Sequence, residues 1–230
     1  MVKKAVILAA GRGTRMQTLT GSVPKPMLEV AGRPLLAHVI ENLREAGLQE
    51  FLVVTGYLAE QVESCFAGAP GIEFRRQEVL NGTARAAVLA RHWGGADDFL
   101  LTFGDILTEP EVYVAMARKL SGYEAVLAVK HVDDPWQGAA VYAEGEQVNR
   151  IIEKPAKGTS TTHWNSAGIY CFRASVWAEL ARVPLSPRGE YELTDAIRLL
   201  VEGGAPVTFY AIPGWWRDVG RHEDLREVPE

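Results

Sequence analysis

The sequence has few cysteines and no long apolar run. Two cysteines in 230 residues, Cys65 and Cys171, are too few for a disulfide framework. Both have apolar neighbours in the sequence, so we expect buried free thiols in a reducing cytosol. No apolar stretch approaches the roughly 20 residues that a membrane-spanning helix needs. These features exclude a disulfide-rich secreted domain and a membrane-embedded protein, and a cytoplasmic location is expected.

An excess of positive charge is also missing. The 24 basic and 29 acidic residues give a net charge of −5, whereas proteins that coat nucleic acid are usually basic. A local pocket can still be positive, so a nucleotide ligand is compatible with this charge. We expect neither a nucleic-acid partner nor a membrane partner, and homo-oligomer formation stays open. The five histidines lack metal-ligand spacing, and no serine or cysteine has a nearby base that would mark a nucleophile.

The most informative segment lies near the N-terminus. The apolar run Ala5–Leu8 is typical of a strand buried on both faces. It leads into the loop 11–15, GRGTR, whose glycines allow the backbone to approach a ligand closely. Exposed N–H groups of such a loop can form an anion-binding nest. The loop arginines and Lys25 add positive charge, which predicts a phosphate chain as the ligand. Pro24 and Pro26 stiffen the backbone around Lys25 and predict a displayed side chain.

Two common glycine loops do not fit this segment. A Walker A loop needs G-x-x-x-x-G-K-[ST], and the spacing here is different. The dinucleotide fingerprint G-x-G-x-x-G requires a third glycine where Met16 stands. The prolines that follow also exclude the first turns of a regular helix.

Hydrophobic patterning predicts alternating strands and helices over the first 130 residues. After the first strand, we expect strands at 51–55, 72–76, 99–103 and 125–130, and helices at 34–46, 58–66, 83–92 and 111–120, with Thr83 as a cap. Such alternation predicts an α/β fold, a mainly parallel sheet with helices on both faces. Strands at 139–142, 148–152 and 169–172 then predict a small antiparallel addition. Helices near 174–181 and 193–202 and a strand at 207–212 complete the pattern.

The segment Leu8–Met16, LAAGRGTRM, with the PKP run at 24–26, resembles the signature of the sugar-1-phosphate nucleotidylyltransferases. The resemblance covers nearly the whole chain and preserves motif order. It implies a Rossmann-like fold of the nucleotide-diphospho-sugar transferase type, with residues 1–230 as a single catalytic domain. It also implies an enzyme that makes NDP-sugar and pyrophosphate from an NTP and a sugar 1-phosphate, with Mg²⁺ as cofactor.

The resemblance assigns roles to particular residues. It implies three catalytic cations, Arg15, Lys25 and Lys154, and two metal ligands, Asp105 and Asp218. It implies that substrates are bound by Leu8, Ala10, Gly11, Gly13, Thr14, Gln77, Gly82, Thr83, Gly138, Glu153 and Asn165. The stretch 188–195, RGEYELTD, also matches a family motif, and we expect it to be mostly architectural and to cap the helix that starts near Leu193.

The substrates are only partly determined. A glutamine amide such as Gln77 suits the N3–H and O4 edge of uracil or thymine, which favours UTP or dTTP over GTP. The N-terminal motif looks like N-acetylglucosamine-1-phosphate uridylyltransferases, whereas the 188–195 stretch looks more like glucose-1-phosphate thymidylyltransferases. Only twelve residues follow Asp218, too few for the left-handed β-helix acyltransferase domain of some members, so acetyl transfer is not expected.

Two other functional classes stay open. A non-catalytic nucleotide- or sugar-binding homologue could share the fold, although such a sensor need not keep the metal ligands. A nicotinamide oxidoreductase is suggested only by the expected sheet and the Gly-x-Gly pattern, and Met16 and the PKP run oppose it.

Overall fold

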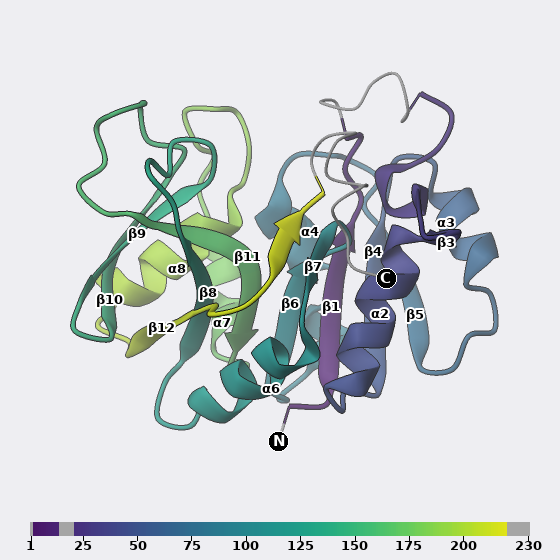
Figure 1. Ribbon diagram of the computed structural model, residues 1–230, viewed down its shortest axis with the longest axis horizontal. Coiled ribbons are helices and arrows are strands. Elements are labelled where there is room, and N and C mark those ends of the chain that lie inside the picture. The colour runs from purple at the N-terminus through teal and green to yellow at the C-terminus, as the bar shows by residue number, and fades with distance from the viewer. Residues whose placement is uncertain (1, 14–20, 220–230) are drawn as a thin grey trace.

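A nine-stranded sheet runs through the molecule in the computed structural model, which describes residues 2–13 and 21–219 (Figure 1). The order of its strands is β5-β4-β1-β6-β11-β8-β12-β10-β9. Their bounds are β1 Lys4–Ala9, β4 Glu50–Thr55, β5 Ile72–Arg76, β6 Phe99–Phe103, β8 Ala125–His131, β9 Ala139–Glu144, β10 Gln147–Glu153, β11 Trp164–Phe172 and β12 Val207–Ala211.

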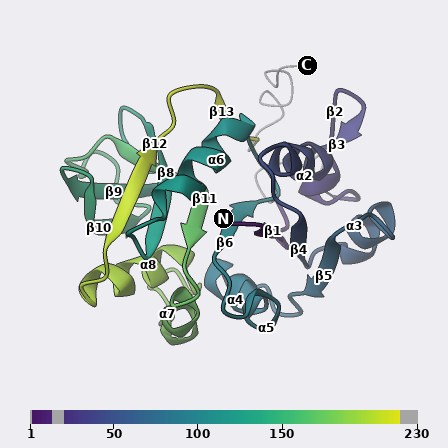
Figure 2. The same cartoon turned by 90° about the horizontal axis from the view of Figure 1, so that it is seen from below.

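Helices cover both faces of this sheet, as the alternating sequence pattern predicts. Figure 2 shows α2 and α6 on one side and α4 and α7 on the other. The helices are α2 Leu35–Glu45, α3 Ala59–Cys65, α4 Thr83–Val88, α5 Arg91–Gly94, α6 Pro110–Lys119, α7 Val176–Arg182 and α8 Leu193–Glu202. Alternate residues of β1 face opposite cores: Val6 packs in the core beneath α4, α7 and α8, and Ile7 in the core beneath α2 and α6.

The sheet is mixed, so the expectation of a mainly parallel sheet was wrong for its second half. Strands β5, β4, β1 and β6 pair in parallel, but β11 lies between β6 and β8 and is antiparallel to both. Strand β11 is shifted in register after Ser166, next to Gly168 with φ +73°. Its first half thereby also pairs with β9, at Asn165 and Ala140. The five strands β11, β8, β12, β10 and β9 thus close on themselves, which goes beyond the small antiparallel addition that was expected.

Two short strand pairs outside the main sheet were not expected from the sequence. Strands β2 (Glu29–Val30) and β3 (Arg33–Pro34) pair just before α2, after the 3-10 turn η2 (Lys25–Met27). Strands β7 (Ile106–Thr108) and β13 (Trp216–Asp218) pair antiparallel outside the main sheet. Runs of two or three residues are too short to show a period in the sequence.

The structure changes two further expectations. The helix expected at 83–92 is divided into α4 and α5 by a tight turn at Leu89 and Ala90, whose N–H groups donate to the carbonyls three residues back, of Ala86 and Ala87. Cys171 is buried, but Cys65 is exposed at the end of α3, so only one of the two thiols lies in the core. Within the described residues, no helix has the length and apolar character to cross a membrane.

Candidate active site

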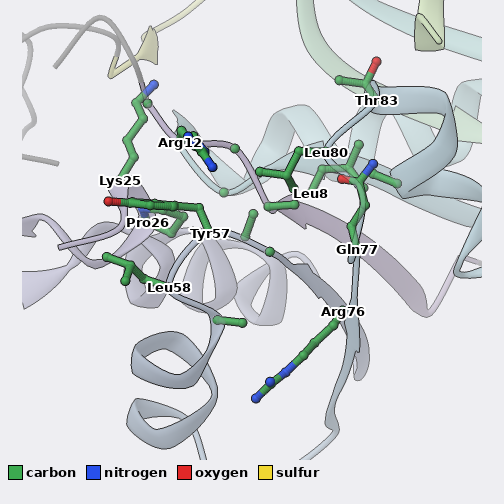
Figure 3. A pocket seen from close by; sticks show the side chains of 18 of the residues that line it. Leu8, Arg12, Lys25, Pro26, Tyr57, Leu58, Arg76, Gln77, Leu80 and Thr83 are labelled. Atoms are coloured by element: carbon green, nitrogen blue, oxygen red, sulfur yellow. The ribbon is translucent and has the colours of Figure 1, made fainter. Parts of the chain in front are cut away.

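A cavity of about 1050 Å³ opens at the carboxyl ends of the parallel strands. Its walls are the segments that follow β1, β4, β5 and β6, at 10–13, 56–60, 76–83 and 103–105. The strand order changes direction between β1 and β6, and open α/β sheets bind ligands at such a point. Figure 3 shows Lys25, Arg12 and Tyr57 on one side of this cavity, and Gln77, Leu80 and Thr83 on the other.

The loop after β1 is closely packed against its neighbour. The Tyr57 N–H donates to the Ala10 carbonyl at 3.0 Å, and the Arg12 guanidinium lies 5.6 Å from the Tyr57 ring centre. Gly11 has open space where a Cβ would be, and Gly13 has φ +60°. Both line the cavity, so the backbone of this loop is accessible to a ligand. The predicted residues Thr14 and Arg15 lie outside the described residues.

Gln77 and Thr83 form the opposite wall, and Thr83 does not cap its own helix. Gln77 is buried, and its side-chain amide donates to the Gly82 carbonyl at 3.1 Å. Gly82, with φ +124°, is the N-cap of α4. The Thr83 hydroxyl instead accepts from the Leu193 N–H at 2.8 Å. It therefore satisfies a free N–H at the start of α8, far away in the sequence.

Lys25, Asp105 and Asp218 meet where β6 ends. The Lys25 ammonium is paired with the Asp105 carboxylate and lies 3.5 Å from Asp218 Oδ1. The pairing of β7 with β13 and a bond from the Val219 N–H to the Asp105 carbonyl at 3.0 Å hold the two aspartates side by side. Lys25 is buried, so the expectation of a displayed side chain was wrong: its ammonium is paired with these two carboxylates at the edge of the cavity that it lines.

A second cavity, of about 560 Å³, adjoins the first. Thr83, Phe103, Asp105 and Glu190 line both cavities. The predicted residues that line the first are Leu8, Ala10, Gly11, Gly13, Lys25, Gln77, Gly82, Thr83 and Asp105. Those that line the second are Thr83, Asp105, Gly138, Glu153, Lys154, Asn165 and Asp218. All predicted site residues that the structure describes therefore lie around one continuous space.

Close backbone contacts shape the second cavity. A Cβ at Gly138 would lie 2.3 Å from Asn165 Oδ1, so only glycine fits beside this side chain. The Gly138 carbonyl accepts from the Lys154 N–H at 2.7 Å, and Lys154 has φ +42°, a costly conformation for a lysine. Asn165 Oδ1 is buried and has no donor among the described residues. A buried acceptor without a partner beside a cavity is suited to a ligand hydroxyl.

Glu153 is held by two residues of the 188–195 stretch, which was expected to be mostly architectural. Arg188 Nη1 lies 3.3 Å from Glu153 Oε1, and the Thr194 hydroxyl donates to Oε2 at 3.1 Å. Arg188 also contacts Glu192 Oε1 at 3.2 Å. Burial raises the pKa of Glu192, and the nearby Glu153 charge raises it further. Polar residues at alternate positions, 188, 190, 192 and 194, are a signal in the sequence for a segment with one face toward a ligand.

The two cavities together have the side chains to bind a polyanion and also contain a pair of carboxylates, Asp105 and Asp218. Lys25 and Lys154 supply positive charge, and the described residues contain no cluster of three or more His, Cys, Asp or Glu side chains placed to hold a metal. Magnesium needs only one or two carboxylates together with water and phosphate oxygens. Asp105 and Asp218 converge on one cation, the Lys25 ammonium, and so fit that requirement.

Two of the comparisons with known proteins name a reaction, and both name transfer of a nucleotidyl group. The sequence matches the family model described as nucleotidyl transferase over residues 4–230. It is 36% identical over 222 residues to the bifunctional protein GlmU of Methanococcus maripaludis, a match that covers 96% of this chain and 52% of that protein. It is 32% identical to the UTP–glucose-1-phosphate uridylyltransferase AglF of Haloferax volcanii, over 99% of this chain and 95% of that protein.

Solved structures show the same fold. A UDP-glucose pyrophosphorylase complexed with UDP-glucose superposes with a TM-score of 0.89 at 22% identity, over 99% of this chain and 97% of that one. A UDP-glucose pyrophosphorylase from Acinetobacter baumanii gives a TM-score of 0.83 at 25% identity, over 99% and 92%. The chain spans about half the length of the bifunctional relatives that it matches.

Proposed function

The chain belongs to the nucleotidyl transferase family, and we propose that it is a sugar-1-phosphate nucleotidylyltransferase, which makes NDP-sugar and pyrophosphate from an NTP and a sugar 1-phosphate. The observation that carries this proposal is the pair of adjoining cavities, which meet at Asp105 beside Lys25 and Asp218. Two substrates can occupy such a space with their phosphates together. Residues 1–230 act as one Rossmann-like catalytic domain in this proposal.

The reaction needs no general base from the protein. The attacking atom is an oxygen of the sugar phosphate, which is already ionised at neutral pH. It attacks the α-phosphorus in line, its new P–O bond forms, and the bond to pyrophosphate breaks. The protein must therefore bring two polyanions together and neutralise their charge.

Three cations of this chain would do so. Lys25 lines the first cavity beside Asp105, which borders both cavities, and Lys154 lines the second, where the sugar phosphate would lie. Arg15 is proposed to contact the triphosphate and the departing pyrophosphate. Asp105 and Asp218 would hold Mg²⁺, which when bound supplies further neutralisation of phosphate charge. Loss of a comparable preorganised donor in other enzymes costs about 3–4 kcal/mol in the barrier.

Each cavity would take one substrate. Leu8, Ala10, Gly11, Gly13 and Thr14 would surround the nucleotide, with Gln77, Gly82 and Thr83 at the base. The names of relatives include a uridylyltransferase and a thymidylyltransferase, which supports UTP or dTTP. Gly138, Glu153 and Asn165 would bind the hydroxyl groups of a sugar of the glucose or N-acetylglucosamine type. The buried Asn165 oxygen and the Glu153 carboxylate are acceptors suited to those hydroxyls.

Pyrophosphate release tests the proposal. The purified protein is assayed with UTP, dTTP and GTP against glucose 1-phosphate and N-acetylglucosamine 1-phosphate, with Mg²⁺. We expect release to depend on both substrates, to favour UTP or dTTP, and to be lost in Lys154→Met. Binding of nucleotide or sugar phosphate without release from any pair would instead indicate a non-catalytic homologue.

A further inference from the structure

One short segment, residues 188–194, contacts the walls of both cavities. It lies between α7 and α8 and includes the first two residues of α8. Its contacts reach residues more than a hundred positions away in the sequence on one side, and about forty on the other. A segment with such contacts determines how the two walls are placed relative to each other.

On the nucleotide side, the contact is made by the backbone. The Tyr191 N–H donates to the Asn81 carbonyl and the Ala84 N–H to the Tyr191 carbonyl, each at 2.9 Å. The Leu193 N–H donates to the Thr83 hydroxyl at 2.8 Å. A Cβ at Gly82 would lie 2.4 Å from the Tyr191 nitrogen, so glycine permits this close approach.

On the sugar side, the contact is made by side chains to one carboxylate. Both Glu153 oxygens accept: Oε1 from Arg188 and Oε2 from the Thr194 hydroxyl. Each carboxylate oxygen has a further lone pair, so Glu153 can still accept from a ligand. Thr194 is buried and β-branched, with few rotamers, whereas the Arg188 side chain is 38% exposed and long. Thr194 is therefore the stiffer of the two supports.

We propose that Thr194 is a positioning residue for sugar binding: its hydroxyl fixes the Glu153 carboxylate in the orientation that receives a sugar hydroxyl. Because the neighbouring Leu193 N–H is bound to Thr83, the same turn of α8 also holds that carboxylate at a set place relative to the nucleotide wall. This inference rests on the proposed function, and it identifies a residue that acts through Glu153 rather than on the reacting phosphates.

The test replaces the hydroxyl without changing the shape of the side chain. Thr194→Val removes the donor, and we expect kcat/KM for the sugar 1-phosphate to fall about tenfold or more, as for other bonds to a charged group. The KM for the NTP should change less than about twofold. Thr194→Ser restores the donor and should recover most of the loss. If valine prevents folding, Thr194→Cys provides a side chain of similar size with only a weak donor.

Thr208→Val is the matched control. Thr208 is also a buried threonine, and its hydroxyl donates to the Glu146 carbonyl at 2.7 Å, away from both cavities. This variant also removes a buried hydroxyl that donates a hydrogen bond, so it should lower the melting temperature, but it should leave the sugar kinetics unchanged.

Since Thr194 itself borders the second cavity, the experiment must separate positioning from direct contact. In a Glu153→Ala background, which removes the acceptor of the Thr194 hydroxyl, positioning predicts that Thr194→Val lowers kcat/KM for the sugar 1-phosphate by less than a further twofold or so, because its effect passes through the missing carboxylate. A full additive loss, an unchanged sugar KM in Thr194→Val, or no recovery in Thr194→Ser would each overturn the inference. A wild-type protein without pyrophosphate release would overturn the proposed function instead.

Discussion

Lys25 is the residue at which substrate and metal requirements meet. Its ammonium is paired with both Asp105 and Asp218. Removal of one charge from a buried ion pair leaves the opposite charge unpaired. When the pair is completely buried, this lowers the free energy of unfolding by about 3–5 kcal/mol. Here the two carboxylate side chains are 25% and 40% exposed, so solvent screens part of that cost.

We expect Lys25→Met to lower the free energy of unfolding by about 1–3 kcal/mol and to abolish most nucleotidyl transfer. The two carboxylates then lack their shared cation, so millimolar Mg²⁺ should recover much of the lost stability. Thermal melts with and without Mg²⁺ measure this. Lys130→Met is the control, because the Lys130 ammonium donates to two carbonyl groups, of Ile212 and Gly214. Equal Mg²⁺ responses of the two variants would contradict the prediction.

Glu192 gives a prediction about pH. Burial, foremost, raises the pKa of this carboxyl in the folded state, so the folded protein binds the proton more tightly than the unfolded chain does. Stability from this group therefore falls as the pH rises from the unfolded value, about 4.3, through the raised value. Glu192→Gln removes this dependence. Urea unfolding across pH 4–7 should show the variant gaining stability relative to wild type as pH rises, and a constant difference would contradict the assignment.

At the scale of elements, Gly82 connects the start of α4 with the segment before α8. We expect Gly82→Ala to destabilise the protein and to weaken nucleotide binding, because a Cβ there would meet the Tyr191 backbone at 2.4 Å. Gly122→Ala is the control: Gly122 also has a positive φ, +96°, but open space around its Cβ position. Both variants carry a backbone cost of about 1–3 kcal/mol. Nucleotide titration should separate them, and equal affinities would show that the contact with Tyr191 is unimportant.

The sequence predicts where strands and helices with a clear hydrophobic period lie better than it predicts which strands pair with one another. Strands such as 51–55 and 99–103 are found where expected, because each is a buried run bounded by turns. The insertion of β11 between β6 and β8 depends on pairing between distant segments and on a bend near Gly168, which no local pattern reveals.

The site shows the same division. Motifs in the sequence indicate Lys25, Asp105 and Asp218, but the pairing of the three-residue strand β13 with β7, which brings Asp218 beside the other two, has no local signal. The support of Glu153 by Thr194 requires the two chain segments to be seen together. Local patterning thus identifies reactive side chains, whereas tertiary pairing determines what holds them.

At the scale of the whole molecule, the two cysteines report on different parts of the fold. Cys65 is exposed, whereas Cys171 is buried in β11, and burial raises the pKa of its thiol strongly. We expect a disulfide reagent to modify one thiol per chain rapidly at pH 8, and the second only after global unfolding. Cys65→Ser should abolish the rapid phase. Rapid modification of both thiols in the native protein would contradict the packing of β11.

The place of β11 also has a consequence for synthesis on the ribosome. Strand β6 pairs with β1 on one edge, and its other edge is covered by β11, which ends at Phe172. Until that point of the chain has emerged, β6 presents an unpaired, apolar edge, the kind of surface that recruits other chains. During synthesis, chaperones are therefore expected to protect this edge from pairing with other chains. The need for protection ends when Phe172, the ninth residue of β11, has left the exit tunnel.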